Sequence, residues 1–419
     1  MPLNNLKVVG LNCGTSVDGI DLAVVSIEIE KLDTENKIVD LAVKLLHYFE
    51  IPMEHAAKRR ILNACIPGTP ISTAELCDMN FAIGEIFGNA TLNSGFDIKK
   101  VDLIASHGQT IWHEPRGAIR NSTLQLGEPA VIANISGKTV ISGFRSAEVA
   151  VGRQGAPICG FLESAILLNH ELVRVSQNIG GIGNVTVVDP KQQFFQFDTG
   201  PGNMLIDSAV RILTGEAQQF DIDGKIGELG EGQIDLAFVE DFLKNEYFSL
   251  MPPKTTGREL FGDNVSAKVV KSLQDKGLSQ EAIVATMTRI TSESIARAYE
   301  SLVIPQISSK KIDEIYLCGG GAHNPNILKH LRNRFPHTTI QKIDKIAPIS
   351  ADAKEAVAFA VLGYLTLNNI RLPIPRFSES DTKVTLGNIT PGENFGSLMA
   401  KLELADVPLT LGNIKISTN

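Results

Sequence analysis

The chain has few cysteines, no excess of basic residues and no long hydrophobic run. Its five cysteines stand apart, without a CxxC pair or a Cys/His cluster, which excludes a disulfide framework and a zinc site. The formal net charge is −8, which argues against nucleic acid because its partners neutralise phosphates with a basic excess. The best apolar run, 356–367, is interrupted by Gly363 and is shorter than the roughly 20 residues of a membrane helix. We therefore expect neither nucleic acid nor a membrane as a partner.

The start of the chain, MPLNNLKVVG, lacks the basic flank and apolar core of a signal peptide. Together with the scattered cysteines, which suit a reducing compartment, this predicts a cytoplasmic protein. The remaining composition is that of an ordinary globular protein, with 43% hydrophobic and 21% charged residues. The length of 419 residues is enough for two or three domains, and the composition excludes disorder and fibrous structure.

Hydrophobic periodicity indicates an α/β protein whose element order begins again in the middle of the chain. A capping-box pattern opens one predicted helix at Ser72. The first half is predicted to contain strands at 7–11, 22–29, 38–49, 101–105 and 123–126 and helices at 53–64, 72–93 and 129–134. The second half is predicted to contain strands at 172–178, 184–188, 194–198 and 314–318 and helices at 202–213, 235–245, 258–276 and 280–303. The repeated order predicts two α/β halves with a boundary between 142 and 170.

Each half opens with two strands joined by a glycine-rich turn. The turns follow Val8–Leu11 in the first half and Val173–Asn178 in the second. A dinucleotide-binding fold places a helix after such a turn, whereas a strand follows here, so the glycines do not indicate NAD binding. We interpret the two turns as equivalent phosphate-binding turns, one in each half. The two halves would face each other across a cleft and bind one polyphosphate between them.

The first turn, Gly14–Asp21, combines glycines, hydroxyls and carboxylates within eight residues. Backbone amides and hydroxyls suit phosphate. Carboxylates beside phosphate require a cation, and Mg²⁺ takes only one or two of them. The alternatives are an ordinary Asx-rich hairpin and, for Glu355, the solvated first turn of the helix 356–365. The candidate nucleotide-binding residues here are Gly14, Thr15, Ser16, Asp18 and Gly19, and the candidate metal ligands are Asp18, Asp21 and Glu355.

The second half contains three further glycine segments. The turn at 178–181 suits terminal phosphates, the segment 200–202 leads into a helix, and the segment 319–321 would let a nucleoside lie against the backbone. For the last of these, a tight connection between strand and helix is the alternative. The candidate nucleotide-binding residues here are Asn178, Gly180, Gly181, Gly200, Gly202, Gly319, Gly320 and Gly321.

Asp198 closes the apolar strand 194–198 and directly precedes Thr199-Gly200-Pro201-Gly202. In α/β sheets the chemistry collects at the carboxyl ends of strands. We therefore predict that Asp198 is a general base, which would take a proton from an oxygen nucleophile. The alternative is that Asp198 caps the helix that follows.

Two polar segments of the first half have residue types that bind sugars. Ser106–Trp112 contains the only tryptophan, and Gln125–Glu128 adds an amide and a carboxylate. Arg153 and the segment Lys254–Arg258 supply cations for phosphate or polar substrate groups, with solvated surface as the alternative. A buried structural histidine is an equal alternative for His107. The candidate substrate-binding residues are His107, Gln109, Gln125, Glu128, Arg145 and Gln154.

Several segments, taken in order, resemble the anhydro-sugar kinase family, which includes anhydro-N-acetylmuramic acid kinase and levoglucosan kinase. The resemblance runs from about Gly10 to Glu355 and covers nearly the whole chain. It implies the sugar kinase, Hsp70 and actin fold, with two related ribonuclease-H-like α/β domains around a cleft that holds ATP. The segments are Gly14–Asp21, Ser106–Thr110, Arg153–Pro157, Asn178–Gly181, Asp198–Asn203 and Lys254–Glu259.

The resemblance also implies a domain division and a reaction. The domains would be 1–142, with the phosphate loop and part of the sugar site, and 143–419, with Asp198, the nucleoside site and a tail able to pack back on the first domain. Such enzymes use Mg·ATP to open a 1,6-anhydro bridge with water and to phosphorylate the freed O6. Asp198 would activate that water. The implied partners are ATP, Mg²⁺ and a small anhydro sugar, and a homodimer is compatible with the sequence.

The resemblance allows more than one sugar. Asn12 and Ile111-Trp112 look more like levoglucosan kinase, so we expect levoglucosan or a similar plain anhydrohexose, with 1,6-anhydro-N-acetylmuramic acid as the alternative. Gly143 stands where the family usually has Asp. Outside this class, the alternatives are an assembly ATPase of the actin or Hsp70 type, in which Asp198 would position water for plain ATP hydrolysis, and an inactive relative.

Overall fold

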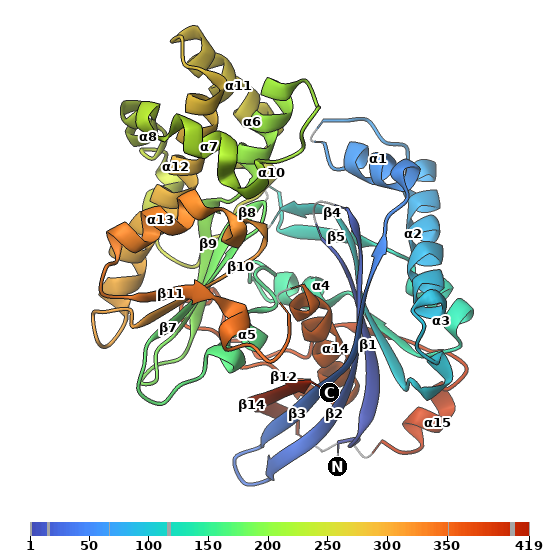
Figure 1. Cartoon of the computed structure of the whole chain (residues 1–419). Helices are drawn as coiled ribbons and strands as arrows, with labels where there is room; N and C mark the ends of the chain where they lie inside the picture. The colour runs from blue at the N-terminus through green and yellow to red at the C-terminus, as the bar shows by residue number, and fades with distance from the viewer. Residues whose placement is uncertain are drawn as a thin grey trace. The chain divides into compact units, whose positions relative to one another are not determined.

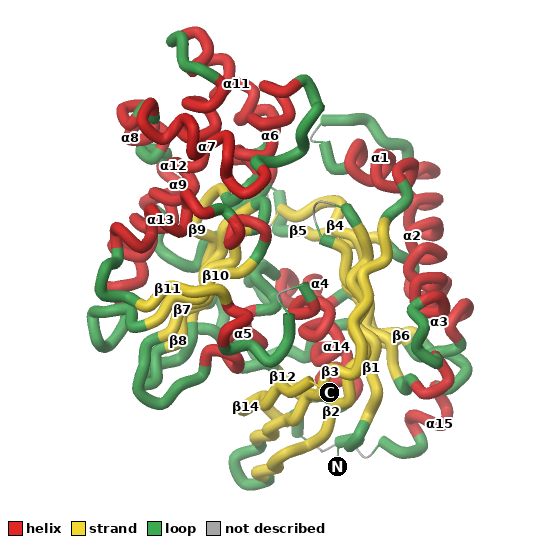
Figure 2. The backbone as a smooth tube through the Cα atoms, viewed as in Figure 1, coloured by secondary structure: helices red, strands yellow, loops and turns green. Residues whose placement is uncertain are grey.

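The chain forms two compact units. The computed structural model describes residues 2–14, 17–66, 68–114, 119–350, 352–402 and 407–418, apart from the side chains of Arg258 and Glu259. Unit 1 comprises residues 1–166, 347–374 and 378–419, and unit 2 comprises residues 167–346 and 375–377. Within the described residues, each unit gathers its strands into a sheet with helices packed against it (Figure 2).

The sheet of unit 1 is mixed. Its strand order is β12-β14-β3-β2-β1-β4-β6-β13, with β5 beside β4. Neighbours among β3, β2 and β1 are antiparallel, whereas β4 runs parallel to β1 and β6 parallel to β4. The strands are β1 (Leu6–Cys13), β2 (Gly19–Asp33), β3 (Ile38–Pro52), β4 (Leu103–Glu114), β5 (Ser122–Leu126), β6 (Val140–Ser142), β12 (Ile370–Arg371), β13 (Asn388–Thr390) and β14 (Leu409–Thr418).

The sheet of unit 2 repeats the central pattern of the first. Its order is β9-β8-β7-β10-β11, with antiparallel neighbours from β7 to β9 and with β10 parallel to both β7 and β11. Numbered within each unit, the unit 2 order is 3-2-1-4-5, and the unit 1 sheet contains 3-2-1-4-6, because its strand 5 is an additional strand that pairs with strand 4. This confirms the two related ribonuclease-H-like α/β domains, while the cleft between them stays a prediction. The strands are β7 (Arg174–Ile179), β8 (Ile182–Val188), β9 (Phe195–Pro201), β10 (Glu314–Cys318) and β11 (Thr339–Lys342).

Helices cover both faces of the unit 1 sheet (Figure 1). Side chains alternate along β1, so Val8 joins the hydrophobic cluster of α14 and Val9 joins the cluster of α2. Helix α14 lies so close to β1 that a Cβ at Gly10 would be 1.9 Å from the carbonyl oxygen of Ala356, and only glycine fits there. The helices are α1 (His55–Ala64), α2 (Thr73–Asn93), α3 (Pro129–Ser136), α4 (Phe144–Ala150), α5 (Gly160–Leu167), α14 (Ala353–Leu367) and α15 (Phe395–Met399).

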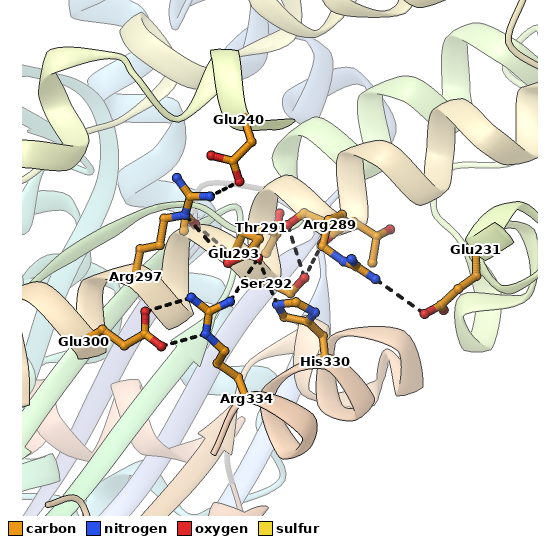
Figure 3. A network of polar contacts seen from close by, with 12 residues as sticks. Glu231, Glu240, Arg289, Thr291, Ser292, Glu293, Arg297, Glu300, His330 and Arg334 are labelled. Carbon is orange, nitrogen blue, oxygen red and sulfur yellow. Dashed lines mark hydrogen bonds and ion pairs between the residues drawn. The ribbon is translucent and has the colours of Figure 1, made fainter. Parts of the chain in front are cut away.

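One hydrophobic cluster joins the unit 2 sheet to its helices. Helix α12 continues into a π-helical turn, Tyr299–Val303, that completes the predicted 280–303 helix. Charged side chains connect α12 to α13, with Glu293 among Arg297, His330 and Arg334 (Figure 3). The helices are α6 (Met204–Thr214), α7 (Lys225–Gly230), α8 (Leu236–Phe242), α9 (Glu246–Ser249), α10 (Arg258–Phe261), α11 (Asp263–Asp275), α12 (Gln280–Ala298) and α13 (Pro325–Arg334).

Most predicted elements are present with somewhat different ends, and three of the differences affect the candidate motifs. Strand β4 continues through 106–110, because an extra residue is accommodated where Gly108 adopts a φ of +74°. Strand β9 continues to Pro201, so Asp198 lies in its middle and not at its end. The predicted helix 258–276 is divided at Gly262. Ser72 caps α2 as predicted, because its hydroxyl accepts a hydrogen bond from the Glu75 amide at 3.1 Å.

The two units divide the chain differently from the expected 1–142 and 143–419. Residues 143–166, 347–374 and 378–419 belong to unit 1. The reason is packing: α14 fills one face of the unit 1 sheet, and β14 pairs with β3. Across the described residues, none of the helices combines the length and the apolar character needed to span a membrane.

Candidate functional site

Unit 2 brings the glycine turns after β7 and β9 together. The Gly202 amide donates to the carbonyl of Gly181 at 2.9 Å, and the Asn203 amide donates to that of Gly180 at 2.7 Å. The Asn203 side chain also donates to the Ile179 carbonyl at 3.1 Å. The β7–β8 turn is therefore fixed to the start of α6, and the Gly202 amide is engaged within the protein.

Glycine is required where these turns meet. A Cβ on Gly202 would lie 2.2 Å from the Gly180 carbonyl oxygen, and one on Gly321 would lie 2.2 Å from Ile179 Cγ2. Gly319 has a φ of +78°, which favours glycine. The segments 178–181, 200–202 and 319–321, which were predicted separately, thus form one packed backbone cluster in unit 2.

Asp198 is the buried acid beside this cluster, with 7% of its surface exposed. The Thr256 amide donates to its Oδ2 at 2.9 Å. The Asp198 amide donates to the Lys254 carbonyl at 3.0 Å, and the Tyr247 hydroxyl donates to the Asp198 carbonyl at 2.7 Å. Both the carboxylate and the main chain are held. The capping alternative is wrong, since α6 begins at Met204 with residue 203 at its N-cap.

Two of the cations predicted for phosphate or polar substrate groups, Lys254 and Arg153, are buried. Lys254 is 1% exposed, its Nζ donates to the Tyr247 carbonyl at 3.1 Å, and it lies 4.5 Å from the centre of the Tyr247 ring. Burial lowers the pKa of Lys254 to about 8, and the negative charge of Asp198 opposes this shift. Arg153 of unit 1 is also buried and pairs with Glu148 at 2.7 Å. Neither side chain is the solvated surface residue of the alternative reading.

The glycine turn of unit 1 connects β1 to β2. Thr15 and Ser16, two of its predicted nucleotide-binding residues, lie outside the described residues, and Gly14 and Gly19 flank them. At Gly19 the turn packs closely on β3, because a Cβ there would lie 2.9 Å from the Ile51 carbonyl oxygen. The backbone on either side of the predicted phosphate loop is therefore held in the sheet.

The three predicted metal ligands do not form one group. Asp18 is exposed and pairs with Lys58. Asp21 accepts a hydrogen bond from the Tyr48 hydroxyl at 2.6 Å, and Glu355 accepts one from the side-chain amide of Asn12 at 2.7 Å. Across the described ranges, no three His, Cys, Asp or Glu side chains surround one metal position.

Asp21 and Glu355 nevertheless fit a cation. Burial raises the pKa of Asp21 to about 6; the Tyr48 hydrogen bond opposes this shift, while the charges of Glu355, Glu50 and Asp352 add to it. Such a concentration of negative charge is relieved by a cation. Mg²⁺ needs only one or two carboxylates when phosphate oxygens supply other ligands.

The sugar residues predicted on β4 lie beside Arg145 of α4. Arg145 Nε donates to His107 Nε2 at 2.9 Å, and its Nη1 donates to the Gly155 carbonyl at 2.6 Å. Burial holds the pKa of His107 well below its ordinary value, and Arg145 lowers it further, so the ring is neutral. In the part of the chain that the structure describes, Ser106 Oγ and Gln109 Oε1 are buried without a hydrogen-bond partner. Such atoms suit a polar ligand.

The other three candidate sugar residues have partners within unit 1. Gln125 Nε2 donates to Thr123 Oγ1 at 2.8 Å, and Glu128 caps α3. Gln154 is 5% exposed and its side-chain amide donates to Glu379. These contacts give each residue a structural role, and a contact with sugar stays a prediction.

The sequence analysis missed the residues that hold the candidate groups. Tyr247 and Thr256 hold Asp198, Tyr48 holds Asp21, and Asn12 holds Glu355. Thr256 belongs to the Lys254–Glu259 motif. The motif indicates a functional segment, but it does not predict the hydrogen bond from Thr256 to Asp198. No local pattern links Tyr247 to a residue 49 positions away.

The comparisons agree with these motifs. The family model described as anhydro-N-acetylmuramic acid kinase matches residues 6–392. A protein of that name from Caldanaerobacter subterraneus subsp. tengcongensis is 38% identical over 396 residues, which is 91% of this chain and 96% of the relative. Another protein of that name, from Crocosphaera subtropica, is 38% identical over 362 residues, which is 85% of this chain and 91% of the relative.

Solved structures give a weaker likeness. The activator of the 2-hydroxyisocaproyl-CoA dehydratase from Clostridium difficile with bound ADPNP has 11% identity and a TM-score of 0.40, covering 86% of this chain and 94% of that one. The fold assignment therefore rests on the strand order of the two sheets.

The relatives confirm the predicted anhydro-sugar kinase family and, with it, a phosphotransferase as the type of enzyme. Within the family they support the stated alternative, anhydro-N-acetylmuramic acid kinase, and give no specific support to levoglucosan kinase, which we expected from Asn12 and Ile111-Trp112. Those are three positions, whereas the matches extend over most of the chain. The chain belongs to the anhydro-N-acetylmuramic acid kinase family.

Proposed function

We propose that this chain is an ATP-dependent kinase that opens the 1,6-anhydro bridge of 1,6-anhydro-N-acetylmuramic acid and phosphorylates O6. The products are N-acetylmuramic acid 6-phosphate and ADP. Family membership supports this proposal, and the observation that carries it is the placement of Asp198. Its buried carboxylate is held by the Thr256 amide next to the packed glycine turns, which suits a general base.

In the proposed reaction, Asp198 accepts a proton from a water molecule while the water oxygen bonds to C1 of the sugar. The C1–O6 bond breaks, and O6 bonds to the γ-phosphorus of ATP as ADP leaves. The proton on Asp198 then passes to solvent. Hydrogen bonds from Thr256 and Tyr247 keep the carboxylate and main chain of Asp198 in place through these steps.

We assign nucleotide binding to the glycine turns of unit 2 and metal binding to carboxylates of unit 1. In unit 2, the glycine turns pack so closely that a side chain does not fit at positions 202 and 321, and the absence of side chains lets the backbone approach a bound nucleotide. In unit 1, Asp21 and Glu355 would hold Mg²⁺, which neutralises phosphate charge when bound. Because the pKa of Asp21 is about 6, we expect metal affinity to fall below that pH.

The proposed sugar carries a carboxylate that levoglucosan lacks, and Arg145 is a suitable cation for it. The neutral His107 accepts a hydrogen bond from Arg145 Nε and orients the guanidinium. Ser106 Oγ and the amide oxygen of Gln109, both without a described protein partner, suit sugar hydroxyls.

The variant Asp198→Asn tests the assignment of the base. The amide oxygen of Asn still accepts a hydrogen bond from Thr256, so nucleotide binding should remain within about twofold, while sugar-dependent ADP release should fall by at least roughly 100-fold. Asp241→Asn, an exposed carboxylate on α8, is the control and should keep full activity. Retained turnover in Asp198→Asn would place the base elsewhere.

A coupled assay of ADP release tests the substrate. We expect kcat/KM for 1,6-anhydro-N-acetylmuramic acid to exceed that for levoglucosan by roughly 100-fold, and Arg145→Gln to lose most of this preference. ADP release that is independent of either sugar would indicate the ATPase alternative, and a preference for levoglucosan would restore the first expectation.

A further inference from the structure

A buried lysine lies behind the proposed base without a role in the reaction described so far. Lys254 precedes Thr256 by two residues and is 1% exposed. An ammonium group is costly to bury, and a lysine is seldom this enclosed unless its charge or its contacts are used.

The Lys254 side chain anchors the segment that holds Asp198. Its Nζ donates to the Tyr247 carbonyl at 3.1 Å and lies 4.5 Å from the Tyr247 ring centre and 5.7 Å from that of Phe197. Tyr247 in turn donates to the Asp198 carbonyl, while the main chain at 254 and 256 pairs with Asp198. The contacts form a closed ring from Asp198 through Lys254 and Tyr247 back to Asp198.

Among the described side chains, one charge influences the pKa of Lys254. Asp198 on β9 is the charge that acts on Lys254, and it raises the pKa of the lysine while burial lowers it to about 8. Helix α9 contributes the ring and carbonyl of Tyr247. The side chains of Arg258 and Glu259, on α10, lie outside the described residues.

We propose that Lys254 is a positioning residue for Asp198: it anchors the 254–256 segment that orients the carboxylate, and its ammonium charge favours the ionised carboxylate in this buried place. This inference rests on the proposed function, in which Asp198 must be ionised to accept a proton. A cation nearby stabilises the ionised form of a carboxyl group, and its removal stabilises the protonated form.

The variant Lys254→Met removes the charge and keeps an apolar chain of similar length. We expect kcat to fall about 10- to 100-fold, as for a displaced reacting group, with KM for ATP within about threefold of wild type. The acid limb of the kcat/KM profile for the sugar should move to higher pH. A structural role alone would lower activity without moving this limb.

Two further variants separate charge from anchoring. Lys254→Arg keeps the charge, and its acid limb should stay where it is in wild type. Lys254→Gln keeps a donor for the Tyr247 carbonyl without the charge, and its acid limb should move as in Lys254→Met, so it replaces that variant if the latter does not fold. Lys276→Met is the control: Lys276 also lies over an aromatic ring, 5.2 Å from the Phe238 ring centre, but it pairs with Asp235, and the profile should not change.

A second readout does not depend on turnover. With carboxyl-¹³C aspartate, the Asp198 resonance, identified by its loss in Asp198→Asn, should titrate at higher pH in Lys254→Met and Lys254→Gln than in wild type. If wild type releases no ADP with the sugar, the proposed function fails and this titration still tests Lys254. An unmoved resonance or acid limb in a folded, uncharged variant would overturn the inference.

Discussion

Among single residues, Asp207 carries a half-buried carboxyl group at a cost to the fold. It lies in the first turn of α6, and burial raises its pKa from 3.8 to about 7; Arg211 opposes this shift and Asp221 adds to it. The folded state therefore binds a proton more tightly than the unfolded chain does. The corresponding stability is fully present below the unfolded pKa and is lost as pH rises through 7.

We predict that Asp207→Asn is more stable than wild type at pH 8, by roughly 2–4 kcal/mol at 1.4 kcal/mol per pH unit. The gain should shrink as pH falls and be absent near pH 4. Urea unfolding at pH 4, 6 and 8 measures it. Asp241→Asn, at an exposed carboxylate of α8, should show no such gain, and a pH-independent effect at Asp207 would contradict the explanation.

Gly143 has a backbone conformation and a close contact that both favour glycine. Its φ is +69°, and a Cβ there would lie 2.6 Å from the side-chain nitrogen of Asn388 on β13. We predict that Gly143→Ala lowers the free energy of unfolding by about 1–2 kcal/mol through both effects. Gly143→Asp should cost less, because Asp tolerates this conformation better and its carboxylate can accept a hydrogen bond from Asn388.

The double variant Gly143→Ala with Asn388→Ala separates the two causes. Removal of the Asn388 amide should restore the part of the loss that comes from the close contact and leave the part due to φ. Thermal unfolding of the single and double variants measures this coupling. Additive losses would show that the contact with Asn388 is unimportant.

At the scale of elements, local patterns predicted strands and helices well and their ends poorly. The Ser72 cap and strand 314–318 are as predicted, because both are determined by neighbouring residues. Strand β9 continues past Asp198 because its pairing with β8 extends to Pro201. Strand β14 was missed because its partner, β3, lies more than 350 residues earlier in the chain.

The α12–α13 pair depends on a charged network centred on Glu293 (Figure 3). The carboxylate lies 3.7 Å from His330 Nε2, 3.4 Å from Arg334 Nη1 and 3.7 Å from Arg297 Nε. The close approach of His330, together with the charges of His330 and both arginines, lowers the pKa of Glu293 below 4.5. The stability that this gives is present above pH 4.5 and is lost as pH falls through the folded-state pKa.

We predict that Glu293→Gln lowers stability at pH 6 by about 1 kcal/mol, a modest value because the ion pairs are long and partly solvated. The difference from wild type should vanish at pH 3. Chemical unfolding at the two pH values checks this. Glu240→Gln, whose carboxylate is 60% exposed beside Arg297, should change stability less, and an equal effect would show that Glu293 is not the centre of the network.

Across the chain, the candidate functional residues are predictable from the sequence, whereas the contacts that hold them in place are not. Repeated glycine turns and Asp198 are visible as short motifs, and in unit 2 they come together as packed backbone. The contacts that hold Asp198 come from residues 49 and 58 positions away, Tyr247 and Thr256. Such contacts follow from the sheet and helix arrangement, which no local window of sequence contains.

The two units differ in whether one continuous segment of the chain contains the whole hydrophobic core. The hydrophobic cluster of unit 2 draws its fully buried residues from 173–340. Unit 1 needs α14 from 353–367, whose apolar face covers Val8 and Ala105. We therefore predict that the fragment 167–346 folds alone and unfolds cooperatively, while the fragment 1–166 does not, because each exposed core side chain forfeits about 1.5–3 kcal/mol. Circular dichroism melting and amide NMR dispersion measure both. A cooperative transition in 1–166 would mean that the unit 1 sheet is stable without α14. The close packing of α14 against Gly10 would then not be needed for folding.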